Sequence, residues 1–393
     1  MASAEERAWD AMVVFCAANN YDGIKLADQH FAEQLSTLVP VLYVDPPVSS
    51  LVPLKRPGKA IRLIGSRVRI LAPGLARLTP VVEPFPSKRR LTGLTARLAR
   101  AYLHRAVAKL GARRVIAVIS AWPQYPVFGT CREQVSVYWA QDDFVGGAGL
   151  LGLDAQHLNA CERRVASRAD LIVAANPLVA DSWRARGGDV LLIPYGADIH
   201  SYAHVDQAPQ ALDVDLEDPI AGFVGHINSR IDIRILEAIA DRGRSLLLVG
   251  PRDPAFEPKR SDALFRRPNV RWVGPKPFDA LPSYLRAIDV GIVPYGDNPF
   301  NRGSFPLKTL EYLAAGRPVV STDLPATRWL DTDLVAAASE PETFAGHVDR
   351  LLDEDRGEDA LIASRREFAA EHSWLVRASE FYDAILSRAG HLE

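Results

Sequence analysis

The chain has 393 residues, of which 48% are hydrophobic and 24% charged, and its net charge is −2. These values are typical of a globular protein with two or three domains, and they exclude a disordered or fibrous chain. Cys16, Cys131 and Cys161 are too few and too widely spaced for a disulfide framework or a zinc site, so we expect a reducing, cytoplasmic setting. The N-terminus has no signal-peptide pattern, and no window reaches the roughly 18 apolar residues of a membrane span.

The first half of the chain alternates short Val-, Ile- and Leu-rich runs with helical patterns. Near-continuous apolar runs predict strands that are buried on both faces, and helices between them make such strands parallel. The predicted strands cover residues 11–17, 39–45, 67–73, 114–120, 135–141, 170–176 and 190–196.

A second series follows a polar segment with scattered Pro, Asp and His, which we interpret as a linker over residues 198–217. We therefore expect domains at 1–197 and 218–371, followed by a terminal helix over 372–393. That helix has a predicted apolar face formed by Leu375, Ala378, Phe381, Tyr382 and Ile385. The strands of the second series are predicted at 220–226, 245–251, 270–275, 290–296, 318–322 and 334–339.

The predicted class is α/β, with two doubly wound Rossmann-like domains that face a central cleft. In open parallel sheets, ligands lie beyond the carboxyl ends of the strands, so the loops there are the ones to search. These loops follow Ala17, Ser120, Gln141, Val224, Gly250, Gly274, Tyr295 and Ser321.

The stretch "SFPLKTLEYLAAGRPVVST", residues 304–322, predicts a helix followed by a buried strand. Pro306 fits the first helical turn, and the N-terminus of a helix attracts anions. Lys308 adds a full positive charge, and Glu311 lies on the same side of the helix one turn later. A lysine suits a phosphate and a carboxylate can accept two sugar hydroxyls, although a simple surface ion pair would use the same spacing.

The stretch "FVGHINSRIDIRIL" has the order strand, glycine turn and helix. Gly225 allows the backbone to approach a ligand closely, and Arg230 stands near the start of the next helix, which is a phosphate-binding layout. His226 is a further candidate for a phosphate contact. The alternative is an ordinary βα turn with a surface arginine. A second turn, Gly274-Pro275-Lys276, follows a later strand.

Acidic residues follow strands of the first half. Asp22 is a candidate for a polar contact with a sugar or acceptor, or else part of an Asp-Gly turn. Asp142 and Asp143 could bind acceptor hydroxyls or serve as a base, and because no third ligand accompanies them we predict no metal site. Asp45 occupies the ribose position of a dinucleotide-binding fold, but the G-x-G-x-x-G turn is absent, which argues against a dehydrogenase.

Residues 55–114 contain 16 Lys and Arg against one acid, Glu83, so their net charge is +15 and the remainder carries −17. Such an asymmetry favours a local anionic partner. An anionic membrane surface or a lipid-diphosphate acceptor would fit, while a sheet-covering helix with a solvated basic back is the alternative. No nucleic-acid-binding module accompanies the charge, so no nucleic-acid partner is predicted. Part of the region is an amphipathic helical pattern whose expected apolar face is Leu91, Leu94, Leu98 and Tyr102.

As a set, the Gly225 turn with Arg230, "VRWVGP", "AIDVGIVPY" and "PLKTLEYLAAGRPVVST" resemble the donor domain of GT-B glycosyltransferases. The resemblance is strongest to the mostly retaining group that uses nucleotide-diphosphate sugars. It covers residues 220–322 and the final "SW" helix, which in this family crosses back onto the N-terminal domain. The first half is similar, through "VYWAQDDF", "CERRVASRADLIVAANPLVADSW" and "LLIPYGAD", to enzymes of teichuronic-acid and other surface-polysaccharide synthesis.

The resemblance implies roles for the matching residues. Arg230 and Lys308 would bind and neutralise the donor diphosphate, Glu311 would hold the ribose hydroxyls, and the Gly274 turn would lie beside the base. Asp22 and Asp142 join Arg230 and Lys308 as the candidate catalytic residues. The expected donor-binding residues are Gly225, His226, Gly274, Lys276, Ser304, Phe305, Pro306, Leu307 and Glu311.

Three positions depart from the family pattern. Gly303 stands where the family often has a second glutamate, "AANNYDG" replaces a Gly-Gly loop, and "SAWPQYP" lacks a histidine. Recognition of the sugar hydroxyls must therefore come partly from other residues.

The expected function is transfer of a sugar from a UDP-linked nucleotide sugar to a glycan or polyprenyl-linked acceptor in cell-surface polysaccharide synthesis. The nucleotide sugar is a substrate, and no metal or other cofactor is expected. The expected location is the cytoplasm, with peripheral contact at the inner face of the membrane. A nucleotide-sugar epimerase or isomerase on the same fold is the alternative, and a sugar-binding protein is disfavoured because it would normally be exported.

Overall fold

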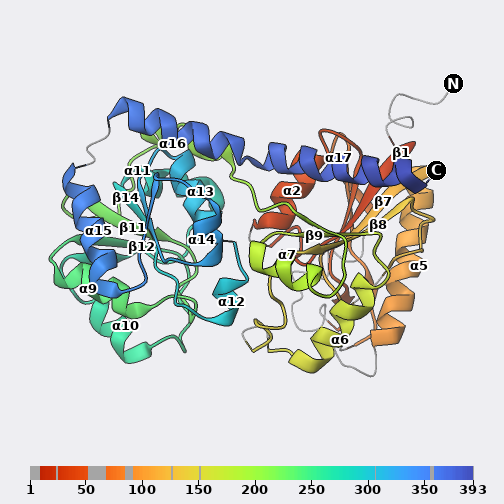
Figure 1. Cartoon of the computed structure of the whole chain (residues 1–393), viewed down its shortest axis with the longest axis horizontal. Helices are drawn as coiled ribbons and strands as arrows, with labels where there is room; N and C mark the ends of the chain where they lie inside the picture. The colour runs from red at the N-terminus through yellow and green to blue at the C-terminus, as the bar shows by residue number, and fades with distance from the viewer. Residues whose placement is uncertain are drawn as a thin grey trace. The chain divides into compact units, whose positions relative to one another are not determined.

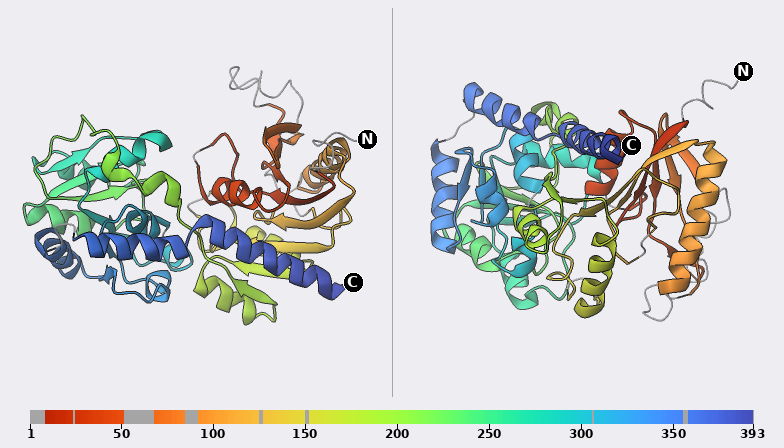
Figure 2. Two further views of the ribbon diagram at one scale, coloured as in Figure 1. Left: turned by 90° about the horizontal axis from the view of Figure 1, so that it is seen from above. Right: turned by 45° about the vertical axis from the view of Figure 1, so that its right-hand side comes forward.

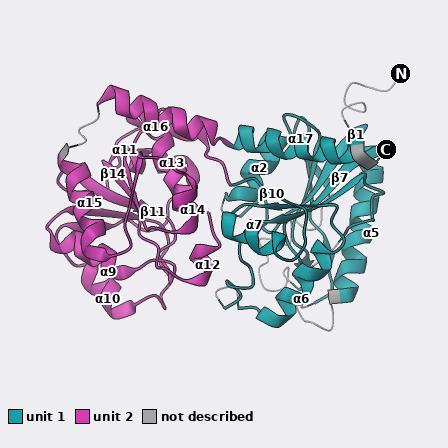
Figure 3. Cartoon of the chain, viewed as in Figure 1, with its two compact units in different colours: residues 1–194, 374–393 teal, residues 195–373 magenta. Residues whose placement is uncertain are grey.

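The computed structural model describes residues 9–23, 25–51, 68–84, 92–124, 127–149, 152–305, 307–354 and 358–392. The chain forms two compact units, residues 1–194 with 374–393 and residues 195–373 (Figure 3). Each unit is built on its own, mainly parallel sheet with helices packed against it (Figure 1). The segment 198–217, which we expected to be a linker, lies within the second unit, where it contains helix α8 (Ile199–Tyr202) and a short 3-10 turn (Val205–Gln207).

The first unit contains an eight-stranded sheet in the order β10-β9-β8-β7-β1-β2-β5-β4. Every neighbouring pair is parallel except β4 and β5. A separate parallel pair joins β3 (Val48–Ser49) and β6 (Val81–Val82). The strands of the large sheet are β1 (Ala11–Cys16), β2 (Val41–Val44), β4 (Val68–Ala72), β5 (Leu75–Leu78), β7 (Arg114–Ser120), β8 (Val135–Ala140), β9 (Leu171–Ala174) and β10 (Val190–Leu192).

Helices cover both faces of this sheet. Successive strand residues point to opposite faces, so the sheet contributes to two cores. Leu103, Val165 and Trp183 bring α5 (Thr92–Leu110), α6 (Ala155–Ala166) and α7 (Pro177–Arg184) into one of them.

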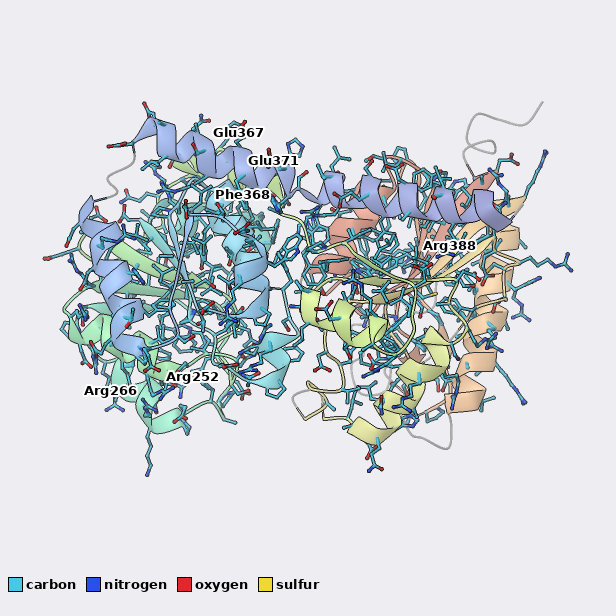
Figure 4. All side chains as sticks on the ribbon, in the orientation of Figure 1. Arg252, Arg266, Glu367, Phe368, Glu371 and Arg388 are labelled. Atoms are coloured by element: carbon cyan, nitrogen blue, oxygen red, sulfur yellow. The ribbon has the colours of Figure 1, made fainter. Side chains whose placement is uncertain are left out.

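On the other face, α2 (Ala27–Leu35) and α17 (Trp374–Leu392) contact each other, and Figure 2 shows them side by side in red and blue. There the Phe31 ring lies 4.5 Å from that of Trp139 on β8 and 4.9 Å from that of Phe381 on α17. An ion pair joins Arg388 of α17, labelled in Figure 4, to Asp189 before β10.

The second unit contains a six-stranded, entirely parallel sheet in the order β13-β12-β11-β14-β15-β16. Every strand region predicted for the two series contains an observed strand, and the α/β class with two parallel sheets is confirmed. The strands are β11 (Ile220–Val224), β12 (Ser245–Val249), β13 (Val270–Trp272), β14 (Val290–Val293), β15 (Val319–Ser321) and β16 (Val335–Ala337).

Helix α13 (Leu307–Ala314) packs directly on this sheet because β14 has a glycine under it. A Cβ on Gly291 would lie 2.3 Å from the ring of Tyr312, so the ring occupies the space that a side chain would take. The Tyr312 hydroxyl also accepts a hydrogen bond from the Val224 N–H at 2.8 Å, which fixes α13 at the carboxyl end of β11. The other helices are α9 (Ile233–Asp241), α10 (Pro258–Leu264), α11 (Leu281–Arg286), α12 (Pro299–Arg302), α14 (Pro325–Trp329), α15 (Pro341–Glu354) and α16 (Asp359–Glu371), with a 3-10 turn at Phe278–Ala280.

For one strand, the predicted burial and pairing were wrong. Residues 67–73 were expected to form a buried parallel strand, but β4 is an antiparallel edge strand whose residues 69–72 are exposed. Gly74, with φ +76°, makes the tight turn that returns the chain as β5, a buried core strand. The apolar pattern missed β5 because Arg77 interrupts it.

Two predicted helix faces needed correction. On α5 the buried residues are Thr95, Ala99, Leu103 and Ala106, whereas Leu94 is 45% exposed, Leu98 and Tyr102 are half-buried and Leu91 lies outside the described residues. On α17 Ala378, Phe381 and Ile385 are buried as predicted, but Tyr382 is only half-buried and Leu375 is 48% exposed. Trp374, 2% exposed, takes the core position instead.

Across the described part of the chain, no helix combines the length and the apolar character needed to cross a bilayer.

Candidate functional site

The carboxyl ends of β11, β12 and β13 meet through glycine backbone. The Gly225 N–H donates to the Val249 carbonyl at 2.8 Å, and the Gly250 N–H donates to the Gly274 carbonyl at 2.9 Å. Gly250 has φ +137°, and a Cβ there would lie 2.0 Å from the Gly225 carbonyl oxygen. Only glycine fits such an approach, so the strand ends meet backbone to backbone at this edge.

Lys308 lies against Gly225. A Cβ on Gly225 would stand 2.4 Å from Lys308 Cε and 2.8 Å from Phe223 Cζ, so the glycine makes room for the lysine stem. Lys308 Nζ is 3.8 Å from Glu311 Oε2, and these two side chains are 23% and 15% exposed. Their neighbours Thr309, Leu310, Tyr312 and Leu313 are buried, so the lysine and the glutamate form the partly exposed side of α13.

The Arg230 guanidinium is held by three side chains. Its Nε donates to Asn301 Oδ1 at 2.9 Å, and its Cζ lies 4.5 Å from the ring centre of Tyr295 and 5.0 Å from that of Phe300. Asn301 is 1% exposed, and its Nδ2 donates to the carbonyls of Arg230 at 2.8 Å and Gly296 at 2.7 Å. Within the described ranges, no carboxylate pairs with this guanidinium.

These groups belong to one edge of the sheet. The Phe223 ring lies beside Gly225 and Lys308 on one side and 6.4 Å from the Tyr295 ring on the other, and Tyr295 stacks on Arg230. The structure therefore brings together four of the predicted residues, Gly225, Arg230, Lys308 and Glu311. Sequence reasoning missed Asn301 and Phe300, although "DNPFNRG" directly precedes the stretch that carries Lys308.

The residues before α13 differ in their surroundings. Ser304 and Phe305 are buried, at 3% and 4% exposure, and the Phe305 ring packs against Tyr195 and Trp329, which is a core environment. Leu307 is half-buried, Pro306 lies outside the described residues, and His226 is exposed immediately after Gly225.

Lys276 has an internal partner. Its Nζ lies 2.6 Å from Asp213 Oδ2, and the Tyr284 hydroxyl donates to the other oxygen of the same carboxylate at 2.8 Å. The hydrogen bond to Asp213 raises the pKa of Lys276. The Lys276 charge thus ties Asp213, in the segment before β11, to the rest of the second unit. Gly274, with φ +73° and open space around it, forms the turn just before Lys276.

In the first unit, Asp22 belongs to a charged cluster. Arg77 donates from Nη1 to Asp22 and from Nε to Asp45, both at 2.7 Å. Asp45 is fully buried and also accepts from the Tyr21 N–H at 2.9 Å, whereas the Asp22 side chain is 46% exposed. Arg77 therefore fixes Asp22 at the carboxyl edge of the sheet, and the dinucleotide position Asp45 is a structural anchor.

Asp142 and Asp143 are half-buried at the end of β8, where Asp143 caps a turn by accepting from the Gly146 N–H at 2.8 Å. The preceding Gln141 donates to the buried Asp28, which also accepts from the N–H groups of Ala18 and Asn19. Burial raises the pKa of Asp28, and these hydrogen bonds oppose that rise. Sequence reasoning missed Asp28, which joins the loops after β1 and β8. Among the described residues, no group of three His, Cys, Asp or Glu could hold a metal ion.

The fold and the edge of the second sheet define a class, the two-sheet GT-B proteins, and comparison with known proteins agrees. Sucrose-phosphate synthase from Thermosynechococcus elongatus superposes with a TM-score of 0.73 at 17% identity, over 96% of this chain and 99% of that one. Anabaena HepE in complex with UDP-glucose superposes with a TM-score of 0.64 at 13% identity, over 96% and 99%.

Sequence comparison points to the second unit in particular. Residues 218–354 match the family model of glycosyl transferases group 1. TuaH of Bacillus subtilis (strain 168), a glycosyltransferase assigned to teichuronic acid biosynthesis, is 30% identical over 244 residues, 59% of this chain and 61% of that protein. The alignment thus covers about three fifths of the length of this curated relative.

Proposed function

We propose that the protein transfers a sugar from a UDP-linked nucleotide sugar to a glycan or lipid-linked acceptor in surface-polysaccharide synthesis. The observation that carries the proposal is the pair of cations, Lys308 against Gly225 and Arg230 held by Asn301, at one sheet edge. That edge lies in the region that matches the group 1 family. HepE with bound UDP-glucose supports the choice of nucleotide, and the likeness to TuaH supports the choice of pathway class.

The chemistry follows from the charge that the reaction develops. Breaking the bond between sugar and phosphate leaves a nucleoside diphosphate with additional negative charge. Lys308 and Arg230 stabilise this leaving group electrostatically, because fixed positive groups lower the barrier most where charge grows in the transition state. Glu311 accepts hydrogen bonds from the ribose hydroxyls. The sugar is transferred with retention of configuration, which the resemblance to the mostly retaining group of GT-B glycosyltransferases supports.

The first unit supplies the acceptor side in this proposal. Asp22, fixed by Arg77, and Asp142 at the end of β8 would contact acceptor hydroxyls. A polyprenyl-linked acceptor lies in a membrane, so the protein would work in the cytoplasm at the inner membrane surface. The exposed cations of α5, Arg97, Arg105 and Lys109, would favour such contact.

A two-stage experiment tests the proposal. A thermal-shift screen with UDP, GDP, dTDP and ADP should show stabilisation by UDP, since a ligand that binds only the folded state raises the melting temperature. Radiolabelled UDP-glucose is then incubated with the enzyme and a bacterial lipid extract, and transfer of label to lipid is measured. Stabilisation by no nucleotide would refute the donor assignment.

The same assay separates transfer from the epimerase alternative. A transferase should release UDP in proportion to labelled product, and little without acceptor. An epimerase should convert the UDP-sugar to its isomer with no acceptor present, which proton NMR of the sugar detects.

A further inference from the structure

We propose that Asn301 is a positioning residue that sets the Arg230 guanidinium for a diphosphate, an inference that rests on the proposed function. Asn301 cannot touch a ligand itself, because it is 1% exposed. Its effect on binding must therefore pass through Arg230. Asn301 Oδ1 accepts from Arg230 Nε at 2.9 Å, and Asn301 Nδ2 donates to the Arg230 backbone carbonyl at 2.8 Å.

The contacts fix both the place and the direction of the guanidinium. Asn301 takes the Nε–H, while the rings of Tyr295 and Phe300 lie 4.5 Å and 5.0 Å from Cζ. The two Nη groups make no hydrogen bond or ion pair with any other residue that the structure describes. A planar fork with its Nη edge uncommitted is the donor arrangement that suits two phosphate oxygens.

Preorganisation explains why these contacts around the Arg230 guanidinium would matter for binding. A long arginine side chain loses rotamer freedom when it binds an anion, and a side chain already held in place loses less. Asn301 is itself fixed, since its N–H donates to Asn298 Oδ1 at 2.9 Å and its Nδ2 bonds two carbonyls.

A purely structural role for Asn301 is the competing explanation, and the unit contains a matched control. Asn269, just before β13, donates from Nδ2 to the carbonyls of Ala240 and Arg244, both at 2.9 Å. Asn269→Ala and Asn301→Ala thus each remove two amide-to-carbonyl bonds from the same unit. The difference between the two asparagines is that the Asn301 side chain also accepts a hydrogen bond from a guanidinium, whereas the described contacts of the Asn269 side chain include none.

The binding test compares a diphosphate with its nucleoside. Calorimetry with UDP and with uridine is carried out on the wild type, Asn301→Ala, Asn269→Ala, Arg230→Ala and the double variant of Asn301 and Arg230. We expect Asn301→Ala to weaken UDP binding about tenfold, the scale of one charge-assisted hydrogen bond, and to leave uridine binding unchanged. In the Arg230→Ala background, Asn301→Ala should have no further effect on UDP, and Asn269→Ala should change neither ligand. Equal loss of UDP and uridine affinity, or a loss that persists without Arg230, would overturn the inference.

A second readout needs no ligand. In protein with isotope-labelled arginine, the Arg230 Nε–H signal is assigned by its disappearance in Arg230→Lys. Its protection from solvent exchange should be lost in Asn301→Ala and kept in Asn269→Ala. If the wild type binds none of the four nucleoside diphosphates, the proposed function fails, and this signal still decides whether Asn301 holds Arg230.

Should Asn301→Ala not fold, Asn301→Ser replaces it, because its shorter side chain removes the acceptor from Nε and adds no charge beside the guanidinium. Nε–H protection should be lost and UDP affinity should fall while uridine affinity is kept. Unchanged UDP affinity with lost protection would contradict the inference.

Discussion

Lys308 Cε lies 2.4 Å from the point where a Cβ would stand on Gly225, so the glycine and the lysine share one space at the carboxyl end of β11. A methyl group at residue 225 would displace the lysine stem or the Phe223 ring, whose Cζ is 2.8 Å from the same point. The glycine thus determines where the lysine charge lies.

We expect Gly225→Ala to weaken nucleoside-diphosphate binding at least several-fold while the protein stays folded, because flexible side-chain atoms can move aside. Calorimetry with UDP measures the loss, and circular dichroism checks the fold. Gly346→Ala is the control, since a Cβ at that position would meet nothing within 4 Å. Wild-type affinity in Gly225→Ala would show that the position of Lys308 is unimportant for the donor.

Glu311 offers a second test of the same edge. If its carboxylate accepts ribose hydroxyls, Glu311→Ala should weaken binding by about 1–3 kcal/mol, the scale of a hydrogen bond to a charged group. The side chain is 15% exposed and pairs with Lys308 only at 3.8 Å, so folding should change little. Comparison of UDP with 2′,3′-dideoxy-UDP isolates the hydroxyls, since the analogue should bind wild type and variant alike. An equal loss for both ligands would argue against ribose recognition.

Arg230 and Lys308 should act on the leaving group more than on the bound donor. Each alanine variant is expected to lower kcat by roughly 10²–10³, the range for removal of one preorganised charge-stabilising group. KM for the UDP-sugar should rise less. Steady-state kinetics separate the two effects, and a rise in KM with unchanged kcat would mean ordinary ground-state binding.

Glu162 predicts a pH dependence of stability that is independent of the donor edge. Burial raises its pKa from 4.5 to about 7, although the Tyr138 hydroxyl donates to it at 2.9 Å and opposes the rise. A carboxyl whose pKa is higher in the folded state stabilises folding fully below about pH 4.5, and that contribution is lost as pH rises through about 7. Ionisation of this buried group then costs on the order of 3 kcal/mol.

Glu162→Gln should therefore be more stable than wild type at pH 8, because it keeps an acceptor for Tyr138 and cannot ionise. The difference in melting temperature should shrink toward pH 5, as measured by calorimetry across that range. Glu367→Gln, on exposed Glu367 labelled in Figure 4, is the control and should show no such trend. A difference that does not vary with pH would contradict the assignment.

The sequence predicted the strands well because parallel strands buried on both faces leave long apolar runs. It placed Gly225, Arg230, Lys308 and Glu311 near one another because such strands end at a common edge. It could not reveal Asn301 or Asp28, whose importance comes from hydrogen bonds to groups 71 and 113 residues away. No local pattern encodes such pairings.

Environment was harder to predict than element type. The Arg77 side chain is 9% exposed in the core strand β5 only because Asp22 and Asp45 pair with it, so a hydropathy pattern is misleading there. Lys276 likewise looked available for a ligand, and its partner Asp213 lies 63 residues earlier in the chain.

The basic region of the first unit predicts attraction to anionic bilayers. Arg97 and Arg105 of α5 are exposed, whereas Lys88, Arg89 and Arg90 lie outside the described residues. Each basic residue near an anionic surface contributes about 1 kcal/mol, and salt screens the attraction over about 8 Å at physiological strength. We therefore expect co-sedimentation with phosphatidylglycerol vesicles at low salt, a steep fall as salt rises, and little binding to neutral vesicles.

Charge reversal decides whether this region carries the binding. Glutamate at Arg97 and Arg105, or at Lys88, Arg89 and Arg90, should sharply reduce co-sedimentation, because these changes lower the net charge of residues 55–114 from +15 to +11 or +9. Glutamate at Lys259 and Arg266, two exposed cations of the second unit, makes the same change in net charge as the first variant and should have a smaller effect. If wild type ignores anionic vesicles even at low salt, the cluster is a solvated surface, and a water-soluble acceptor becomes the better hypothesis.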